Sequence, residues 1–132
     1  MLSYLVILLD ALFSLSHGKD AVACAVSDHN IGIDVENIVP YNLDVVRGVC
    51  SAEEHEMLEQ SANKDVDFIK LWTVKEAISK YEGMGLSMPF AGIDISKYSV
   101  RTWDYNKLFL SSCADYGVQQ CRSIQVISPS II

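Results

Sequence analysis

The sequence is poor in basic residues and has no motif that would commit its cysteines or histidines to a metal. Its 132 residues include 10 lysines and arginines against 17 acidic residues, a formal net charge of -7. Binding to nucleic acid requires a basic face, so this composition argues against a nucleic-acid partner. None of the four cysteines forms a C-x-x-C pair, and the three histidines lack zinc-site spacing. We expect reduced, mostly buried thiols in a cytoplasmic protein.

The chain also lacks a hydrophobic run suited to crossing a membrane. Met1 to Leu15 is strongly apolar, but Asp10 interrupts the run and no lysine or arginine precedes Lys19. A signal peptide would begin with positive charge, and a spanning helix needs about 20 apolar residues. We therefore predict a buried strand or strand pair here, and no membrane partner.

No repeat, low-complexity tract or linker divides the sequence. Hydrophobic residues make up 50 % of the chain, which excludes disorder. The length suits one domain with one core, so we predict a single domain over residues 1–132.

Apolar periodicity and turn residues predict strands first, then helices, then strands again. The first strands are expected at 13–15, 21–27 and 31–35, with the last two joined as a hairpin through residues 28–30. Helices are expected at 43–49, from a capping box at Ser51 to Gln60, and from Asp65 or Asp67 to about Tyr81, ended by Gly83.

The remaining strands are expected at 92–95, 99–103, 107–113 and 124–127, with a hairpin turn at 104–106. This order predicts an α+β domain: a mainly antiparallel sheet with helices packed on one face.

Two carboxylates lie on one apolar strand. In Gly32-Ile33-Asp34-Val35-Glu36, the i and i+2 spacing points Asp34 and Glu36 to the same side of a sheet. The ordinary interpretation is a solvated strand face, with Ile33 and Val35 toward the core. Side-by-side anions repel, however, and a bound cation such as Mg²⁺ would remove that cost.

A helix carries the second group of charged residues, in Trp72-Thr73-Val74-Lys75-Glu76-Ala77-Ile78-Ser79-Lys80. Glu76 and Lys80 stand one turn apart on one face. Such a pair is usually an ordinary surface ion pair worth about 0.3–0.5 kcal/mol. Upstream, Ser14 to Lys19 combines hydroxyls, a histidine and a lysine at a strand end, which is either a plain turn or a phosphate contact.

Taken together, these motifs resemble those of the surfactin-type 4′-phosphopantetheinyl transferases. The resemblance rests on Phe13 to His17, on Gly32 to Glu36, and on Trp72-x-x-Lys75-Glu76-Ala77-x-x-Lys80-x-x-Gly83-x-Gly85-Leu86. Weaker similarity extends from Val100 to Ala114. The combination, in this order and spacing, is specific, although no single piece is.

The resemblance implies Mg²⁺-dependent transfer of the phosphopantetheine arm of coenzyme A to a serine of an apo acyl or peptidyl carrier protein, releasing adenosine 3′,5′-bisphosphate. It implies Asp34, Glu36 and Glu76 as Mg²⁺ ligands, with Glu76 helping to deprotonate the serine, and Lys80 as the residue that stabilises or protonates the leaving phosphate. It further implies contacts to coenzyme A from Ser16, His17 and Lys75.

The chain matches only the second half of a surfactin-type enzyme, whose active site lies between two similar halves. The resemblance therefore implies a phosphopantetheinyl-transferase-like half-domain. We expect a homo-oligomer if the chain is complete, or else a chain that lacks its front half. Two other functions remain open: a half-domain that binds metal or coenzyme A without turnover, and a different Mg²⁺-dependent phosphate-handling enzyme.

Overall fold

The computed structural model describes residues 12–84, 87–115 and 123–127. The strands are β1 (Leu12–His17), β2 (Val22–Ser27), β3 (Ile31–Asn37), β4 (Ser99–Asp104), β5 (Leu108–Ala114) and β6 (Ser123–Ile127). The helices are α2 (Leu43–Val49), α3 (Ala52–Glu59) and α4 (Lys64–Glu82), and the short 3₁₀ turns are η2 (Phe90–Gly92) and η3 (Ile95–Lys97). Most of the apolar start expected to form strands, and Cys121, lie outside the described residues.

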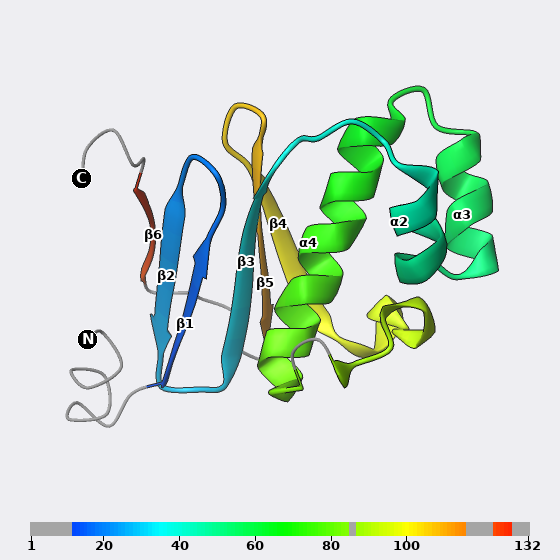
Figure 1. Ribbon diagram of the computed structural model, residues 1–132. Coiled ribbons are helices and arrows are strands. Elements are labelled where there is room, and N and C mark those ends of the chain that lie inside the picture. Colours follow the sequence, from blue (N-terminus) through cyan, green and yellow to red (C-terminus); the bar gives the residue numbers. More distant parts are fainter. Residues whose placement is uncertain (1–11, 85–86, 116–122, 128–132) are drawn as a thin grey trace.

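The strands form two antiparallel three-stranded sheets, ordered β1-β2-β6 and β3-β5-β4. Figure 1 shows the sheets side by side, with β1 next to β3, and with α4 between the second sheet and the α2–α3 pair. The expected α+β class with antiparallel strands is confirmed. No helix in the described ranges is both long and apolar enough to cross a membrane.

The expected hairpin between residues 21–27 and 31–35 is wrong. Strand β2 pairs with β1 and β6, whereas β3 pairs with β5. The chain turns between β2 and β3 as predicted, but the two strands enter different sheets. They meet through side chains, because Ala23 and Ala25 of β2 share one buried cluster with Ile33 and Val35 of β3.

Serine side chains connect the two sheets. The backbone N–H groups of Ile33 and Val35 donate to Ser14 Oγ at 3.0 Å and Ser16 Oγ at 3.1 Å, respectively. These amides of β3 therefore have partners although β1 and β3 share no backbone ladder. Small side chains on β1 bring the strands close enough for this contact.

Alternation along β3 divides its residues between two environments. Ile31, Ile33 and Val35 pack into the cluster shared with β2, as the sequence predicts. Gly32 lies on the other side, against α4: a Cβ there would be 2.2 Å from the Ala77 carbonyl oxygen. Only glycine permits this approach, which places Asp34 and Glu36 beside the helix.

The helices begin and end largely where their capping residues predict. Ser51 and Glu54 form the expected capping box of α3. Gly83, with φ 73°, ends α4 in a Schellman motif, because Gly83 N–H donates to the Lys80 carbonyl and Met84 N–H to that of Ser79. The N-cap of α4 is Asn63 rather than the predicted Asp65 or Asp67.

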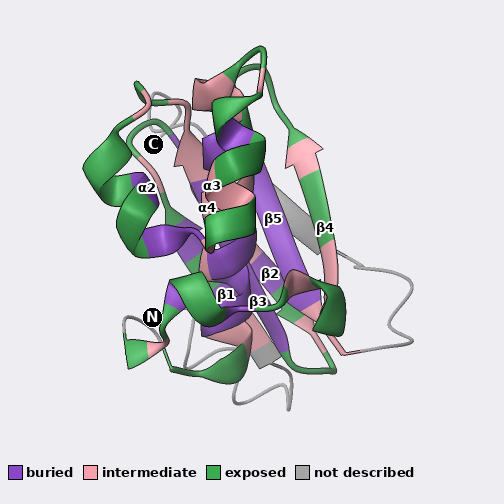
Figure 2. Ribbon diagram, turned by 90° about the vertical axis from the view of Figure 1, so that its right-hand side faces the viewer, coloured by how far each residue is buried: buried purple, intermediate pink, exposed green. Residues whose placement is uncertain are grey.

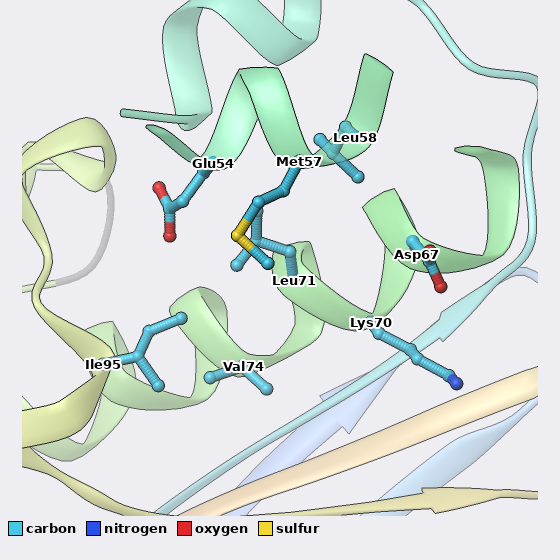
Figure 3. Close-up of a pocket in the computed structure, with 8 residues that line it drawn as sticks. All are labelled: Glu54, Met57, Leu58, Asp67, Lys70, Leu71, Val74 and Ile95. Atoms are coloured by element: carbon cyan, nitrogen blue, oxygen red, sulfur yellow. The ribbon is translucent and has the colours of Figure 1, made fainter. Parts of the chain in front are cut away.

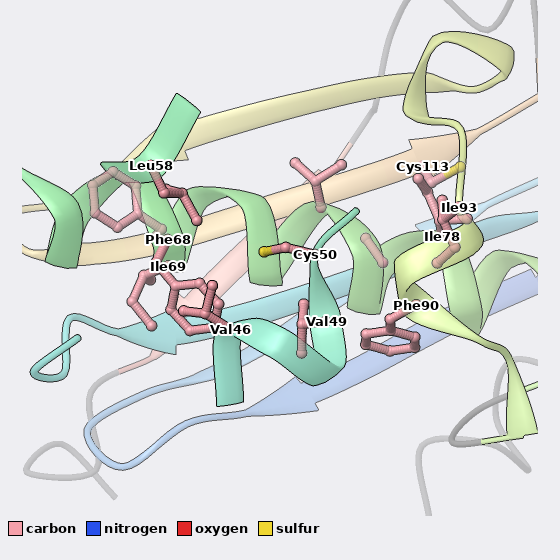
Figure 4. Close-up of a cluster of buried hydrophobic side chains, with 13 residues drawn as sticks. Val46, Val49, Cys50, Leu58, Phe68, Ile69, Ile78, Phe90, Ile93 and Cys113 are labelled. Atoms are coloured by element: carbon pink, nitrogen blue, oxygen red, sulfur yellow. The ribbon is translucent and has the colours of Figure 1, made fainter. Parts of the chain in front are cut away.

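A second hydrophobic cluster fills the space between α4, α2, α3 and η2 (Figure 4). Its members are Val46, Val49, Cys50, Leu58, Phe68, Ile69, Val74, Ala77, Ile78, Phe90, Ile93, Phe109 and Cys113. Figure 2 shows that α4 is largely buried while α2 and α3 expose most of their surface. Helix α4 is thus the central element of the helical layer.

The strand expected at 92–95 is absent: this segment forms parts of η2 and η3 with an extended link. Local hydrogen bonds explain the difference. The Asp94 carboxylate accepts from the Ser96 amide, and the Phe90 carbonyl accepts from Ile93 N–H. The hairpin between β4 and β5 is confirmed, with Asn106 and Lys107 both at positive φ in its turn.

Candidate functional site

The close packing of β3 on α4 brings together charged side chains that are distant in sequence. Asp34 is only 4 % exposed. Its Oδ1 accepts from Ser16 Oγ at 3.0 Å and faces Lys80 Nζ at 3.4 Å. Its other oxygen, Oδ2, is buried and has no hydrogen-bond partner. A buried carboxylate oxygen without a donor is costly, so it marks a place where a ligand would be stabilised.

The carboxylates of the site influence one another. Burial, followed by the Glu36 charge, raises the pKa of Asp34 to about 8, against the opposing effects of Lys80 and Ser16. Burial also raises the pKa of Glu76, with Glu36 adding to the rise and Lys80 opposing it. Three acidic groups and one lysine therefore share a single electrostatic environment.

Trp72 connects the helix to Glu36. Its indole Nε1 donates to Glu36 Oε1 at 3.2 Å. The indole packs, with its ring centroid 5.5 Å from that of Phe90, but its N–H also orients one of the carboxylates.

The residues fit a hard cation, although they are not drawn together around one. Within the described ranges, no three His, Cys, Asp or Glu side chains form a ready metal cluster. Two features nevertheless favour a cation: the unpaired Oδ2 of Asp34, and the burial that, together with the Glu36 charge, raises the pKa values of Asp34 and Glu76. All the candidate donors are carboxylate oxygens, the type that Mg²⁺ prefers.

Lys80 lies at the edge of this group and is loosely held. Its Nζ is 3.4 Å from both Asp34 Oδ1 and the Leu15 carbonyl oxygen, and its side chain is 30 % exposed. Contacts of this length hold the ammonium only weakly. Asp34, Glu36, Glu76 and Lys80 are thus near enough to influence one another's charge, although the carboxylates do not converge on one point.

Ser16 and His17, expected to contact coenzyme A together, lie on opposite faces of β1. Ser16 is 4 % exposed, and its hydroxyl donates to Asp34 while accepting from Val35 N–H. His17 is exposed at the end of the strand. Only His17 is open to an external ligand.

The structure places Lys75 away from the other site residues. It is fully buried at 0 % exposure, and its Nζ donates to the Val49 carbonyl at 2.8 Å, to Glu54 Oε1 at 2.6 Å and to the Phe90 carbonyl at 2.7 Å. All three N–H bonds of the ammonium are used inside the protein. In this arrangement Lys75 joins α4 to α2, α3 and η2 and has no donor left for a phosphate.

A groove of about 430 Å³ lies elsewhere, between α3, α4 and η3 (Figure 3). Its lining is mainly apolar and includes Met57, Leu71, Val74 and Ile95. Its charged lining residues are Glu54, Asp67 and Lys70. The candidate site residues Asp34, Glu36, Glu76 and Lys80 do not line it. We assign no chemistry to this groove.

Comparison with known proteins relates the chain to one family. The sequence profile of the 4′-phosphopantetheinyl transferase superfamily matches residues 30–125, more than half of the chain. The chain is 33 % identical over 100 residues to the 4′-phosphopantetheinyl transferase gsp of Aneurinibacillus migulanus, covering 74 % of this chain and 42 % of that protein. It is 36 % identical over 94 residues to the 4′-phosphopantetheinyl transferase Sfp of Bacillus subtilis strain 168, covering 70 % and 40 %. The chain thus spans less than half the length of these relatives.

Solved structures share the fold. The holo-[acyl-carrier-protein] synthase of Thermotoga maritima superposes with a TM-score of 0.54 at 14 % identity, over 64 % of this chain and 61 % of that one. The enzyme of the same name from Neisseria meningitidis gives 0.53 at 17 % identity, over 65 % and 97 %. By sequence profile and by relatives, with a fold that agrees, the chain belongs to the 4′-phosphopantetheinyl transferase superfamily.

Proposed function

We propose that this chain carries the catalytic half-site of a Mg²⁺-dependent phosphopantetheinyl transferase, which moves the phosphopantetheine arm of coenzyme A to a serine of an apo acyl or peptidyl carrier protein. The observation that carries the proposal is Asp34: one oxygen is held by Ser16 and Lys80, and the other is buried without a partner beside further carboxylates. Family membership supports this reaction class.

Asp34, Glu36 and Glu76 would hold the cation. When bound, Mg²⁺ would neutralise charge on the pyrophosphate of coenzyme A and thereby stabilise the transition state electrostatically. Before a cation binds, Trp72 orients Glu36 and Ser16 orients Asp34. Oriented ligands cost less to organise during the reaction.

The reaction forms a P–O bond from the carrier serine to the phosphorus that bears pantetheine, and it breaks the P–O bond to adenosine 3′,5′-bisphosphate. Glu76 is the base that receives the serine proton, a role suited to a carboxylate whose pKa burial raises. Lys80 stabilises the charge that appears on the leaving phosphate. Its loose contacts and partial exposure support this role.

His17 is the contact to the 3′-phosphate of coenzyme A in this proposal. Its exposed place at the end of β1 supports that role. Ser16 and Lys75 are left out of the set that touches coenzyme A, because their polar atoms are engaged inside the protein.

The test is a mass assay. The protein is incubated with coenzyme A, Mg²⁺ and apo carrier protein, and the carrier is examined for the added phosphopantetheine. We expect a mass gain that chelator abolishes. Glu76→Gln should lose it too, because the amide keeps the shape but not the charge. Full transfer by Glu76→Gln, or in excess chelator, would refute the proposal.

Two further variants separate binding from chemistry. Lys80→Ala should mainly lower kcat, because its charge matters most as the leaving phosphate forms. His17→Ala should mainly raise KM for coenzyme A and reduce the preference over dephospho-coenzyme A. Metal binding without any transfer would identify a half-domain that lacks turnover.

A further inference from the structure

The Ser16 hydroxyl occupies a central place between the two sheets and the carboxylates. The hydroxyl oxygen accepts a hydrogen bond from Val35 N–H at 3.1 Å, and the hydroxyl group donates one to Asp34 Oδ1 at 3.0 Å. The side chain is 4 % exposed. One buried group thus fixes both the backbone of β3 and the carboxylate that projects from it.

This contact makes the two oxygens of Asp34 unequal. Oδ1 accepts hydrogen bonds from Ser16 Oγ and Lys80 Nζ, whereas Oδ2 is buried and has no hydrogen-bond partner. A carboxylate can rotate about its last bond, and a short-range donor on one oxygen restricts that rotation. Ser16 therefore determines the direction in which the free oxygen points.

Ser14 provides an internal comparison. It lies on the same face of β1, is 8 % exposed, and accepts from Ile33 N–H at 3.0 Å. The hydrogen bonds of the described residues give it no carboxylate partner. Ser14 and Ser16 thus share the contact between sheets, and only Ser16 also reaches Asp34.

We propose that Ser16 is a positioning residue for cation binding, which holds Asp34 with its free oxygen toward the metal and does not itself touch coenzyme A. The proposal rests on the metal site of the proposed function. It assigns Ser16 a role through Asp34 instead of a role at the phosphate.

The experiment compares Ser16→Ala with Ser14→Ala in the full chain. Each variant loses one serine contact between the sheets, and Ser16→Ala also loses the hydrogen bond to Asp34, so its metal-free melting temperature should fall at least as far as that of Ser14→Ala. Affinity for Mn²⁺ is measured by electron paramagnetic resonance, and the rise in melting temperature with Mg²⁺ is recorded, both without coenzyme A or carrier. We expect Ser16→Ala to lose about 10-fold in metal affinity, while Ser14→Ala keeps the wild-type value.

Several outcomes would overturn the proposal: unchanged metal affinity in Ser16→Ala, an equal loss in both variants, or a wild-type protein that binds neither metal. A changed ratio of efficiencies for coenzyme A and dephospho-coenzyme A in Ser16→Ala would also overturn it, because Ser16 would then contact the phosphate. If Ser16→Ala does not fold, Ser16→Cys preserves the volume while supplying only a weak donor, and the same loss is expected.

Failure of the proposed function gives a different result. A wild-type protein that binds Mn²⁺ but transfers nothing to the carrier refutes the transfer reaction, while the comparison of Ser14 with Ser16 still decides the positioning role.

Discussion

Single residues at the site combine burial with charge, and Asp34 does so most strongly. Its pKa is raised from 3.8 to about 8, first by burial and then by Glu36, with a smaller contribution from Glu76 and opposition from Lys80 and Ser16. The folded protein therefore binds a proton that the unfolded chain releases above pH about 4. Because the proton is bound more tightly in the folded state, it stabilises the fold. That stabilisation is complete below pH about 4 and is lost as the pH rises to about 8.

We expect the melting temperature in chelator to fall between about pH 5 and about pH 8.5, as Asp34 ionises. Mg²⁺ should restore stability at the upper end by binding the native state. Differential scanning calorimetry across this range tests both effects. Asp34→Asn should flatten the metal-free slope, and an unchanged slope in that variant would show that other groups cause it.

Lys75 differs from Asp34 in that all the polar atoms of its buried side chain are paired, so it should stabilise the fold through these contacts. Lys75→Met should cost about 3–5 kcal/mol of unfolding free energy, because Glu54 and two carbonyls lose their buried donor. Denaturant unfolding measures this. The control is Lys64→Met, which breaks a partly exposed pair with Glu59 and should cost about 1 kcal/mol or less. Equal costs would contradict the structural role of Lys75.

The sequence predicts the residue types of the site better than their partners. Strand alternation and helix spacing are local, so they place Asp34 with Glu36, and Glu76 with Lys80, on the correct faces. The separation of Lys75 from them follows from tertiary contacts with α2, α3 and η2, which no local pattern reveals. The indole–carboxylate bond from Trp72 to Glu36 is equally non-local.

At the scale of elements, the site depends on how closely α4 approaches β3. Gly32→Ala would place a Cβ 2.2 Å from the Ala77 carbonyl and 2.4 Å from Tyr81 N, both backbone atoms. We expect a loss of about 3 kcal/mol and a weaker response to Mg²⁺, because the helix must move away from the strand that carries Asp34. Thermal unfolding with and without Mg²⁺ measures both.

Gly48→Ala is the matched control for this change. Gly48 lies in α2, and a Cβ there meets nothing within 4 Å. Alanine should stabilise the helix by about 0.5–1 kcal/mol. Should both alanine variants behave alike, the close approach of α4 to β3 would not be the reason for glycine at position 32.

The elements differ in how far the sequence could predict them. Capping residues such as Ser51 and Gly83 act within a few residues, so the helices are found with small errors at their ends. Strand partners are decided by long-range contacts, and the pairing of β2 with β6 instead of β3 escaped prediction for that reason. The segment 92–95 has the apolar pattern of a strand, but local turns at Asp94 and Phe90 prevail.

At the scale of the whole molecule, the expected assembly between copies remains a prediction. Buried positions of β2, such as Ala23 and Ala25, are covered within the chain. Its opposite face, together with β1, exposes Leu15 at 42 % and Val26 at 37 %. If the chain transfers phosphopantetheine without another protein, sedimentation should show a homo-oligomer, and Leu15→Glu should dissociate it without loss of fold.

Met57→Glu is the control, because Met57 is 72 % exposed but lies in the groove between α3 and α4. It should leave the assembly intact. A wild-type protein that sediments as a monomer with full transfer activity would exclude a site built from two copies.

The serine contacts between β1 and β3 have a consequence for motion. Two amides of β3 are held by single hydroxyls, so this boundary can open while the ladders inside each sheet stay intact. In hydrogen exchange, the amides of Ile33 and Val35 should lose protection at a lower free energy than those of the β3–β5 ladder. Asp34 lies at this boundary, so its contact with Ser16 should open at a lower free energy than global unfolding requires.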